Sequence, residues 1–198
     1  MPTCYNLLIN KLVVFYFDLG SPYAYLAAER VAAGILEVEP AWEPMLLGAI
    51  FGYRGRGSWS QTDARDGNVA ELERRAREYG LPPIAWPPGW PGDGLAAMRA
   101  ATWARRCGAG VEFALAAYRR AFVNGDALTI ETLAETADDV GLSGAELREA
   151  IGDPVIKAAL RAATDAAWSA GVSGVPTVRV ADQLFYGDDQ LERAAAAA

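Results

Sequence analysis

The sequence predicts an α/β fold: a four-stranded mixed sheet that is interrupted by a large all-helical insertion. The first observation is the order of the elements, strand–helix–strand near the start and helix–strand–strand–helix near the end. The second is the run "KLVVFYFD", which is apolar without alternation and therefore typical of a strand buried on both faces. The third is the long middle part, where glycines separate segments with helical spacing of apolar residues.

The first strand is expected over residues 11–18, followed by a helix over 21–34. Ser21 is placed to cap this helix, and Pro22 occupies its first position, where a missing N–H costs nothing. A second strand is expected over 36–46, and its prolines place it near an edge of the sheet. These elements predict a β-α-β unit.

The middle of the chain predicts a loop and then a block of helices. Residues 46–67 are rich in Gly, Arg and aromatic residues without a clear period, and loops of this length are usually functional. A helix is expected over 68–80, a stiff Pro/Trp connector over 80–94, and further helices up to about residue 152.

The last part of the chain returns to the sheet. A long helix is expected after Asp153-Pro154, and residues 174–187 alternate as a hairpin, followed by a short closing helix. Two domains follow from this order. Residues 11–47 and 153–198 form the sheet-containing domain, and residues 48–152 form the helical insertion domain with an active-site loop.

Composition excludes several classes of function. The net charge of −7 argues against nucleic acid and anionic membranes as partners, and no apolar run approaches the roughly 18 residues of a membrane span. The chain has no histidine, which excludes Ser-His-Asp catalysis and His-based metal sites, so no metal is expected. Cys4 and Cys107 form no CxxC pair, and Cys107 is expected to be a buried structural thiol. "MPTCYNLLINK" lacks a signal-peptide pattern, so a cytoplasmic location is expected.

Three motifs carry a resemblance to a known family. "FYFDLGSPYAYLA", "GVPT" and "LFYGDDQLE" occur in this order, and "AMRAAT" lies between them in the helical block. The element order is that of the thioredoxin fold with a DsbA-like helical insertion. Together the motifs resemble the 2-hydroxychromene-2-carboxylate isomerase family and its relatives, the kappa-class glutathione transferases. The resemblance implies glutathione, or another low-molecular-weight thiol, as cofactor.

Ser21 has two interpretations. It stands where thioredoxins carry the first cysteine of CxxC, and the four positions read "SPYA", so dithiol exchange is excluded there. A serine without a histidine base is a poor nucleophile. Ser21 is therefore either a helix cap alone or, as the resemblance implies, a catalytic residue that donates a hydrogen bond to the glutathione thiolate and lowers its pKa.

The resemblance also implies where glutathione is held. It makes Val175–Pro176 a cis peptide, with the backbone of Val175 free to pair with the cysteine of glutathione as in strand addition. It places Asp189 against the ammonium of the γ-glutamyl group, with a less secure role for Asp188. The alternatives are a proline that only begins a strand and two acids that only favour the helix dipole.

The resemblance implies a glutathione-dependent isomerase whose substrate is a small molecule, an aromatic or unsaturated carboxylate. Tyr23, Arg54 and Arg56 are candidate substrate-binding residues, the arginines as a clamp for a carboxylate. Trp59, Trp86, Trp90 and Trp103 are candidates to hold flat rings, with a core role expected for Trp103. A kappa-like transferase or peroxidase and a non-catalytic binding protein of the same fold remain alternatives, and a homodimer stays open.

Overall fold

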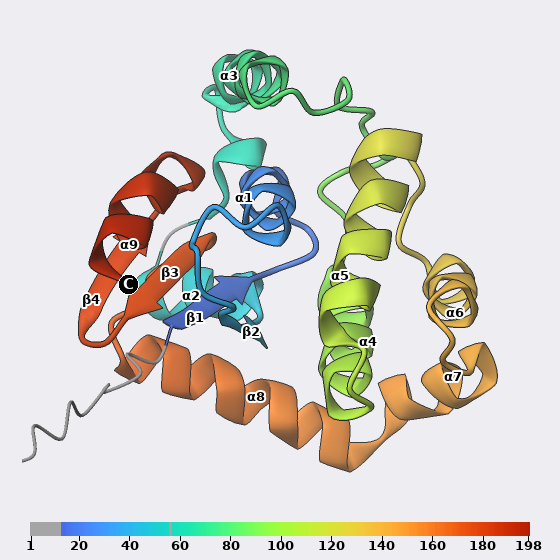
Figure 1. Ribbon diagram of the computed structural model, residues 1–198. Coiled ribbons are helices and arrows are strands. Elements are labelled where there is room, and N and C mark those ends of the chain that lie inside the picture. Colours follow the sequence, from blue (N-terminus) through green and yellow to red (C-terminus); the bar gives the residue numbers. More distant parts are fainter. Residues whose placement is uncertain (1–12, 56) are drawn as a thin grey trace, which may run out of the picture.

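A four-stranded mixed sheet lies at the centre of the protein (Figure 1). The computed structural model describes residues 13–55 and 57–198. The strand order is β2-β1-β3-β4, with β1 parallel to β2 and antiparallel to β3, and β4 antiparallel to β3. The strands are β1 (Val13–Phe17), β2 (Ala41–Pro44), β3 (Thr177–Val180) and β4 (Gln183–Tyr186). The predicted mixed sheet of a thioredoxin fold is therefore confirmed.

Strand β1 is central because every one of its residues is apolar or aromatic and buried. Its aromatic side chains pack against β2, where the Trp42 ring centroid lies 4.8 Å from that of Phe15 and 5.7 Å from that of Phe17. Strand β2 is shorter than the predicted segment and lies at an edge, as its prolines indicate. The burial of β1 fixes the place at which the chain leaves the sheet toward helix α1.

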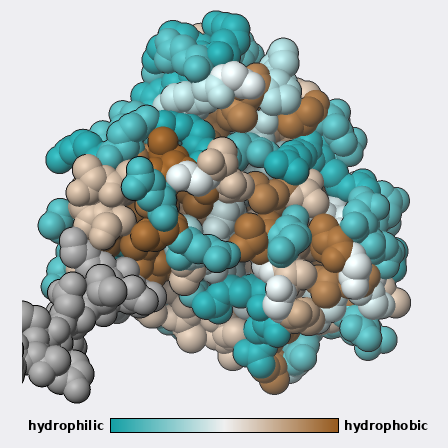
Figure 2. Space-filling view, in the orientation of Figure 1, coloured by the Kyte–Doolittle hydropathy of each residue, from teal (hydrophilic) through white to brown (hydrophobic). Residues whose placement is uncertain are grey.

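Helices cover the sheet and build a separate block beside it (Figure 1). Helix α1 packs with α3, and α8 runs along the opposite side of the sheet toward the block. The hydrophilic surface over α3 is visible at the top of Figure 2. The helices outside the block are α1 (Pro22–Ala32), α2 (Leu47–Arg54), α3 (Arg65–Glu78), α8 (Pro154–Ser169) and α9 (Leu191–Ala197). The block contains α4 (Leu95–Arg106), α5 (Gly110–Arg119), α6 (Ile130–Asp139) and α7 (Gly144–Gly152).

The expectation of an irregular loop over 46–67 is wrong. Residues 47–54 form helix α2, a 3₁₀ turn covers Trp59–Gln61, and α3 begins at Arg65. Helix α2 lacks a capping side chain and an acid in its first turn, so its sequence carries no start signal. Tertiary contacts supply the missing partners, because the N–H groups of Leu46 and Leu47 donate to side chains of distant elements.

Cys107 is exposed, which corrects the prediction of a buried thiol. It follows the last turn of α4 as the C-cap residue, beyond the stripe of buried side chains that faces the core. Cys4, Arg56 and the first two residues of the predicted strand 11–18 lie outside the described residues. Within the part of the chain that the structure describes, no helix is long and apolar enough to cross a membrane. The division into two domains stays a prediction.

Candidate active site

Ser21 lies where β1 hands the chain to α1, and it is a helix cap. Its Oγ accepts a hydrogen bond from the N–H of Ala24 at 3.3 Å, and the residue is 7% exposed. This bond uses the oxygen as an acceptor and leaves the hydroxyl proton without a partner among the described residues. The positive end of the α1 dipole also favours negative charge at this place. Capping and donation to an anion are therefore compatible in one side chain.

Two hollows meet at Ser21. The sheet-side hollow, about 310 Å³, is bordered by residues 174–176 and 186–189 and by side chains of α3. The insertion-side hollow, about 500 Å³, is bordered by residues 57–61 and 90–95. Ser21 and Trp59 line both, so a group held at the Ser21 hydroxyl is within reach of ligands on either side.

The sheet-side hollow offers an unused backbone. The Val175–Pro176 peptide bond is cis, as predicted. The carbonyl of Pro176 accepts from the N–H of Gly187 at 3.0 Å, whereas the backbone of Val175 makes no hydrogen bond to any described residue. An unpaired N–H and C=O at the border of a hollow suit an extended peptide laid alongside them.

The two acids of "GDD" differ in their surroundings. Asp188 is 1% exposed and accepts hydrogen bonds from Arg75 at 2.8 Å and from the Tyr79 hydroxyl at 2.9 Å. Burial raises the pKa of Asp188, and the Arg75 guanidinium acts in the opposite direction. The side chain of Asp189 is 52% exposed and its nearest cation is Arg75, at 3.8 Å. Asp188 is thus held by the protein, while Asp189 keeps free acceptor capacity toward the hollow.

Helix α3 contributes two side chains that the sequence did not indicate. Asn68 accepts a hydrogen bond from the Tyr23 hydroxyl at 2.8 Å, and the Arg75 guanidinium lies 5.8 Å from the centre of the Tyr23 ring. Both line the sheet-side hollow, together with Tyr23 itself. Arg54 lines the same hollow and donates to the carbonyl of Ser173 at 2.8 Å. In the sequence, α3 is a strongly charged helix, and no spacing distinguishes these two residues from its solvent-facing ones.

The insertion-side hollow contains a buried carboxylate that sequence reasoning also missed. Asp18 is 4% exposed and accepts the N–H groups of Gly20 and Leu47, each at 2.8 Å. Burial raises its pKa to about 6, and the two N–H groups limit the rise. The available signal was an acid placed directly after a fully apolar strand run. Asp18 joins the end of β1 to the start of α2 and so shapes the floor of this hollow.

Trp59 and Trp90 line the insertion-side hollow, with ring centroids 5.5 Å apart, and Phe51 is a third aromatic residue there. The Trp90 Nε1–H donates to the carbonyl of Gly20 at 3.1 Å, which connects this wall to the Ser21 turn. Trp86 packs on Trp90 at 4.8 Å and lines neither hollow. Trp103 is buried in the core, as expected.

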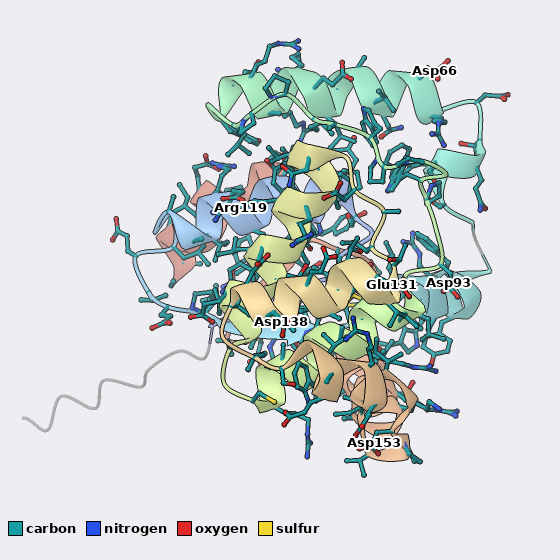
Figure 3. All side chains as sticks on the ribbon, turned by 90° about the vertical axis from the view of Figure 1, so that its right-hand side faces the viewer. Asp66, Asp93, Arg119, Glu131, Asp138 and Asp153 are labelled. Atoms are coloured by element: carbon teal, nitrogen blue, oxygen red, sulfur yellow. The ribbon has the colours of Figure 1, made fainter. Side chains whose placement is uncertain are left out.

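The charged side chains that line the insertion-side hollow are both negative among the described residues. Asp93 lies on the segment before α4 (Figure 3), and it joins Asp18 in the lining. None of the described residues that line this hollow is a lysine or an arginine. The described residues also contain no cluster of three or more acids or cysteines able to hold a metal ion.

The fold and the Ser21 turn define a thioredoxin-fold protein of the DsbA-like class. A family model described as "DSBA-like thioredoxin domain" matches residues 12–197. A solved structure of cytosolic disulfide reductase DsbM from Pseudomonas aeruginosa with GSH superposes with a TM-score of 0.64 at 16% identity, covering 93% of this chain and 96% of that chain.

A narrower relationship comes from the sequence. The chain is 30% identical over 191 residues to 2-hydroxychromene-2-carboxylate isomerase from Sphingobium xenophagum, which covers 93% of this chain and 96% of the relative. A solved structure of a 2-hydroxychromene-2-carboxylate isomerase superposes with a TM-score of 0.85 at 21% identity, covering 94% and 93% of the two chains. The chain belongs to the 2-hydroxychromene-2-carboxylate isomerase family.

Proposed function

We propose that this protein is a glutathione-dependent isomerase that acts on an aromatic or unsaturated carboxylate. The observation that carries the proposal is the hydroxyl of Ser21, which caps α1 through its oxygen and keeps its proton available at the junction of two hollows. The isomerase named among its relatives supports the reaction class. The cytoplasmic location expected from the sequence is part of this proposal.

The residues of the sheet-side hollow fit glutathione. The unpaired backbone of Val175 suits the cysteine residue of a peptide laid beside it, and the half-exposed Asp189 carboxylate suits an ammonium group. Arg54 stands at the same hollow and suits a carboxylate. When bound, the thiol supplies a nucleophile that adds to a conjugated double bond, allows rotation about the bond made single, and leaves again.

The protein's own residues prepare this chemistry. Ser21 donates a hydrogen bond from its hydroxyl to the thiolate and, with the α1 dipole, lowers the pKa of the thiol. Trp59 and Trp90 hold the flat part of the substrate against the same turn. Asp18 fixes the Gly20 and Leu47 amides, so the turn that carries Ser21 stays in one geometry.

The decisive experiment is ultraviolet titration of the bound glutathione thiolate in the wild type, Ser21→Ala and Ser21→Asp. Alanine removes the donor, and aspartate caps the helix but places a negative charge against the thiolate. A charge-assisted hydrogen bond is worth about 1.5–3 kcal/mol, which corresponds to about one to two pH units in the thiol pKa. We expect a raised pKa in both variants, with Ser21→Asp as stable as the wild type.

Ser143→Ala is the matched control. Ser143 caps α7 with the same geometry, since its Oγ accepts from the N–H of Glu146 at 3.3 Å. This variant should lose about 1 kcal/mol of stability, as a cap does, and leave the thiol pKa unchanged. An equal thiol pKa in the wild type and both Ser21 variants contradicts the proposal. Glutathione binding without isomerisation of 2-hydroxychromene-2-carboxylate or related acids supports the alternative of a binding protein.

A further inference from the structure

A third hollow, of about 370 Å³, lies between α2, α4 and α8 and is lined by three cations. We call it the cationic hollow. Arg99 of α4 and Lys157 and Arg161 of α8 provide the charges, and Leu46 and Leu95 provide apolar wall. The family resemblance assigns it no role.

The cations of this hollow are poorly paired. The Nε–H of Arg99 is buried and has no hydrogen-bond partner, and its guanidinium forms no ion pair with any residue the structure describes. Lys157 likewise has no ion-pair partner within the described ranges 13–55 and 57–198, and Arg161 reaches only Asp165, at 3.8 Å. Other arginines are well paired, such as Arg119, whose guanidinium meets Glu29 at 2.7 Å. A buried donor without an acceptor is costly, and a bound anion would supply the missing acceptor.

The cationic hollow adjoins the insertion-side hollow. Leu46 and Leu95 line both, so the two hollows meet at these two residues. The charges on the two sides are opposite, because Asp18 and Asp93 are the only titratable groups among the described residues of the insertion-side hollow. A carboxylate placed beside them would be repelled, whereas one directed past Leu46 and Leu95 would meet a guanidinium.

We propose that the cationic hollow binds the carboxylate of the substrate, with Arg99 as the principal ligand, while the unsaturated part of the substrate lies against Ser21. This inference rests on the proposed function and refines it. A site of this kind favours acids in which a rigid ring separates the carboxylate from the reacting carbons, because the carboxylate must extend beyond Leu46 and Leu95 into the cationic hollow. Planar, bidentate pairing with a carboxylate is the chemistry to which a guanidinium is best suited.

The test compares two probes of nearly the same shape, the anion 1-naphthoate and its neutral amide 1-naphthamide. Binding of each is measured by quenching of tryptophan fluorescence, without glutathione, in the wild type, Arg99→Gln and Lys157→Gln. In the wild type we expect naphthoate to bind at least about tenfold more tightly than the amide, as for a charge-assisted pair. The preference should disappear in Arg99→Gln and weaken about threefold in the exposed Lys157→Gln.

Arg106→Gln is the matched control, since Arg106 lies on the same helix, is exposed and does not line the cationic hollow. It should keep the full preference for naphthoate. Equal binding of the two probes by the wild type, or an unchanged preference in both Arg99→Gln and Lys157→Gln, overturns the inference. Competition by inorganic phosphate as strong as that by naphthoate also overturns it, because it indicates a site for free anions rather than for the substrate.

The outcome is separable from that of the proposed function. A thermal scan of the wild type with millimolar glutathione measures thiol binding independently, since a ligand specific for the folded state raises the melting temperature. If glutathione has no effect while the naphthoate preference depends on Arg99, the thiol assignment fails and the carboxylate site stands. If glutathione stabilises the protein while naphthoate shows no preference, the carboxylate site fails and the thiol assignment stands.

Discussion

The two hollows that meet at Ser21 differ in how their charges are arranged. On the sheet side, Asp188 is paired with Arg75, and Asp189 and Arg54 add one further charge of each sign. On the insertion side, the titratable groups that the structure describes are two acids, among aromatic and aliphatic walls. The first arrangement suits a zwitterionic peptide, and the second suits a flat apolar body.

Under the proposed function, this difference means that Ser21 serves two ligands of different chemistry. It also explains why the acids of the site are not equivalent. Asp188 and Asp18 are buried and hold protein groups, whereas Asp189 is half exposed and holds none firmly. Predictions that separate structural acids from ligand-facing ones therefore test the comparison directly.

The largest effect is expected at Asp188. Asp188→Ala removes the acceptor that both the Arg75 guanidinium and the Tyr79 hydroxyl use, and it leaves a partly buried cation with fewer partners. Breaking a buried ion pair in this way should lower the free energy of unfolding by about 3 to 4 kcal/mol, measured by urea denaturation.

Asp189→Ala is the comparison for that variant. The Asp189 side chain is 52% exposed, and its carboxylate lies 3.8 Å from the Arg75 guanidinium, which is too far for a hydrogen bond. We therefore expect little loss of stability. The same variant should weaken glutathione binding, measured by calorimetry, because the ammonium loses its partner. Equal losses of stability in the two variants contradict the distinction between a structural and a ligand-facing acid.

The next effect concerns pH and Asp18. Burial raises the pKa of Asp18 from 3.8 to about 6, so the folded protein binds more protons than the unfolded chain between these values. Stability from this group is therefore highest below about pH 4 and falls as pH rises through 6. The loss amounts to about 2 to 3 kcal/mol at neutral pH.

Asp18→Asn isolates this contribution, since the other titrating groups are common to both proteins. The free energy of unfolding of the wild type minus that of the variant should fall by about 2 to 3 kcal/mol between pH 4 and pH 8. Asparagine presents only one oxygen to the N–H groups of Gly20 and Leu47. This lowers the variant's free energy of unfolding by the same amount at every pH, so it does not affect how the difference between the two proteins varies with pH. If the free energies of unfolding of the two proteins change with pH in parallel, the pKa of Asp18 is not raised by folding, and the prediction is wrong.

The parts of the site that the sequence predicts are those that lie on one short stretch of chain. Ser21 follows a readable strand and begins a readable helix, and its cap is confirmed. The cis bond at Val175–Pro176, which the family resemblance implies, is confirmed. The hairpin after it is confirmed for the same reason as the cap. Local turns are determined by neighbouring residues, so a motif is sufficient to predict them.

The parts that the sequence did not predict depend on packing between distant segments. Helix α2 is stabilised at its start by Asp18 and Thr164, and nothing within residues 46–67 reveals those partners. Asn68 and Arg75 reach the site only because α3 lies over α1. Cys107 is exposed rather than buried, because helical spacing of apolar residues does not show at which turn a helix leaves the core.

The smallest effect is expected at Trp90, and it separates the two hollows most cleanly. Trp90→Phe keeps a ring against Trp59 and Trp86 but removes the N–H donated to Gly20, which should cost about 1 kcal/mol of stability. Because Trp90 lines only the insertion-side hollow of the two, naphthoate binding should weaken while glutathione binding stays unchanged.

Trp86→Phe is the control for this variant. Trp86 lines neither hollow, and its indole N–H makes only a long contact of 3.4 Å with Glu73, so both affinities should be retained. Loss of glutathione affinity in Trp90→Phe would show that the two hollows are coupled through the Gly20–Ser21 turn, to which the Trp90 N–H is bonded, and would contradict their independence.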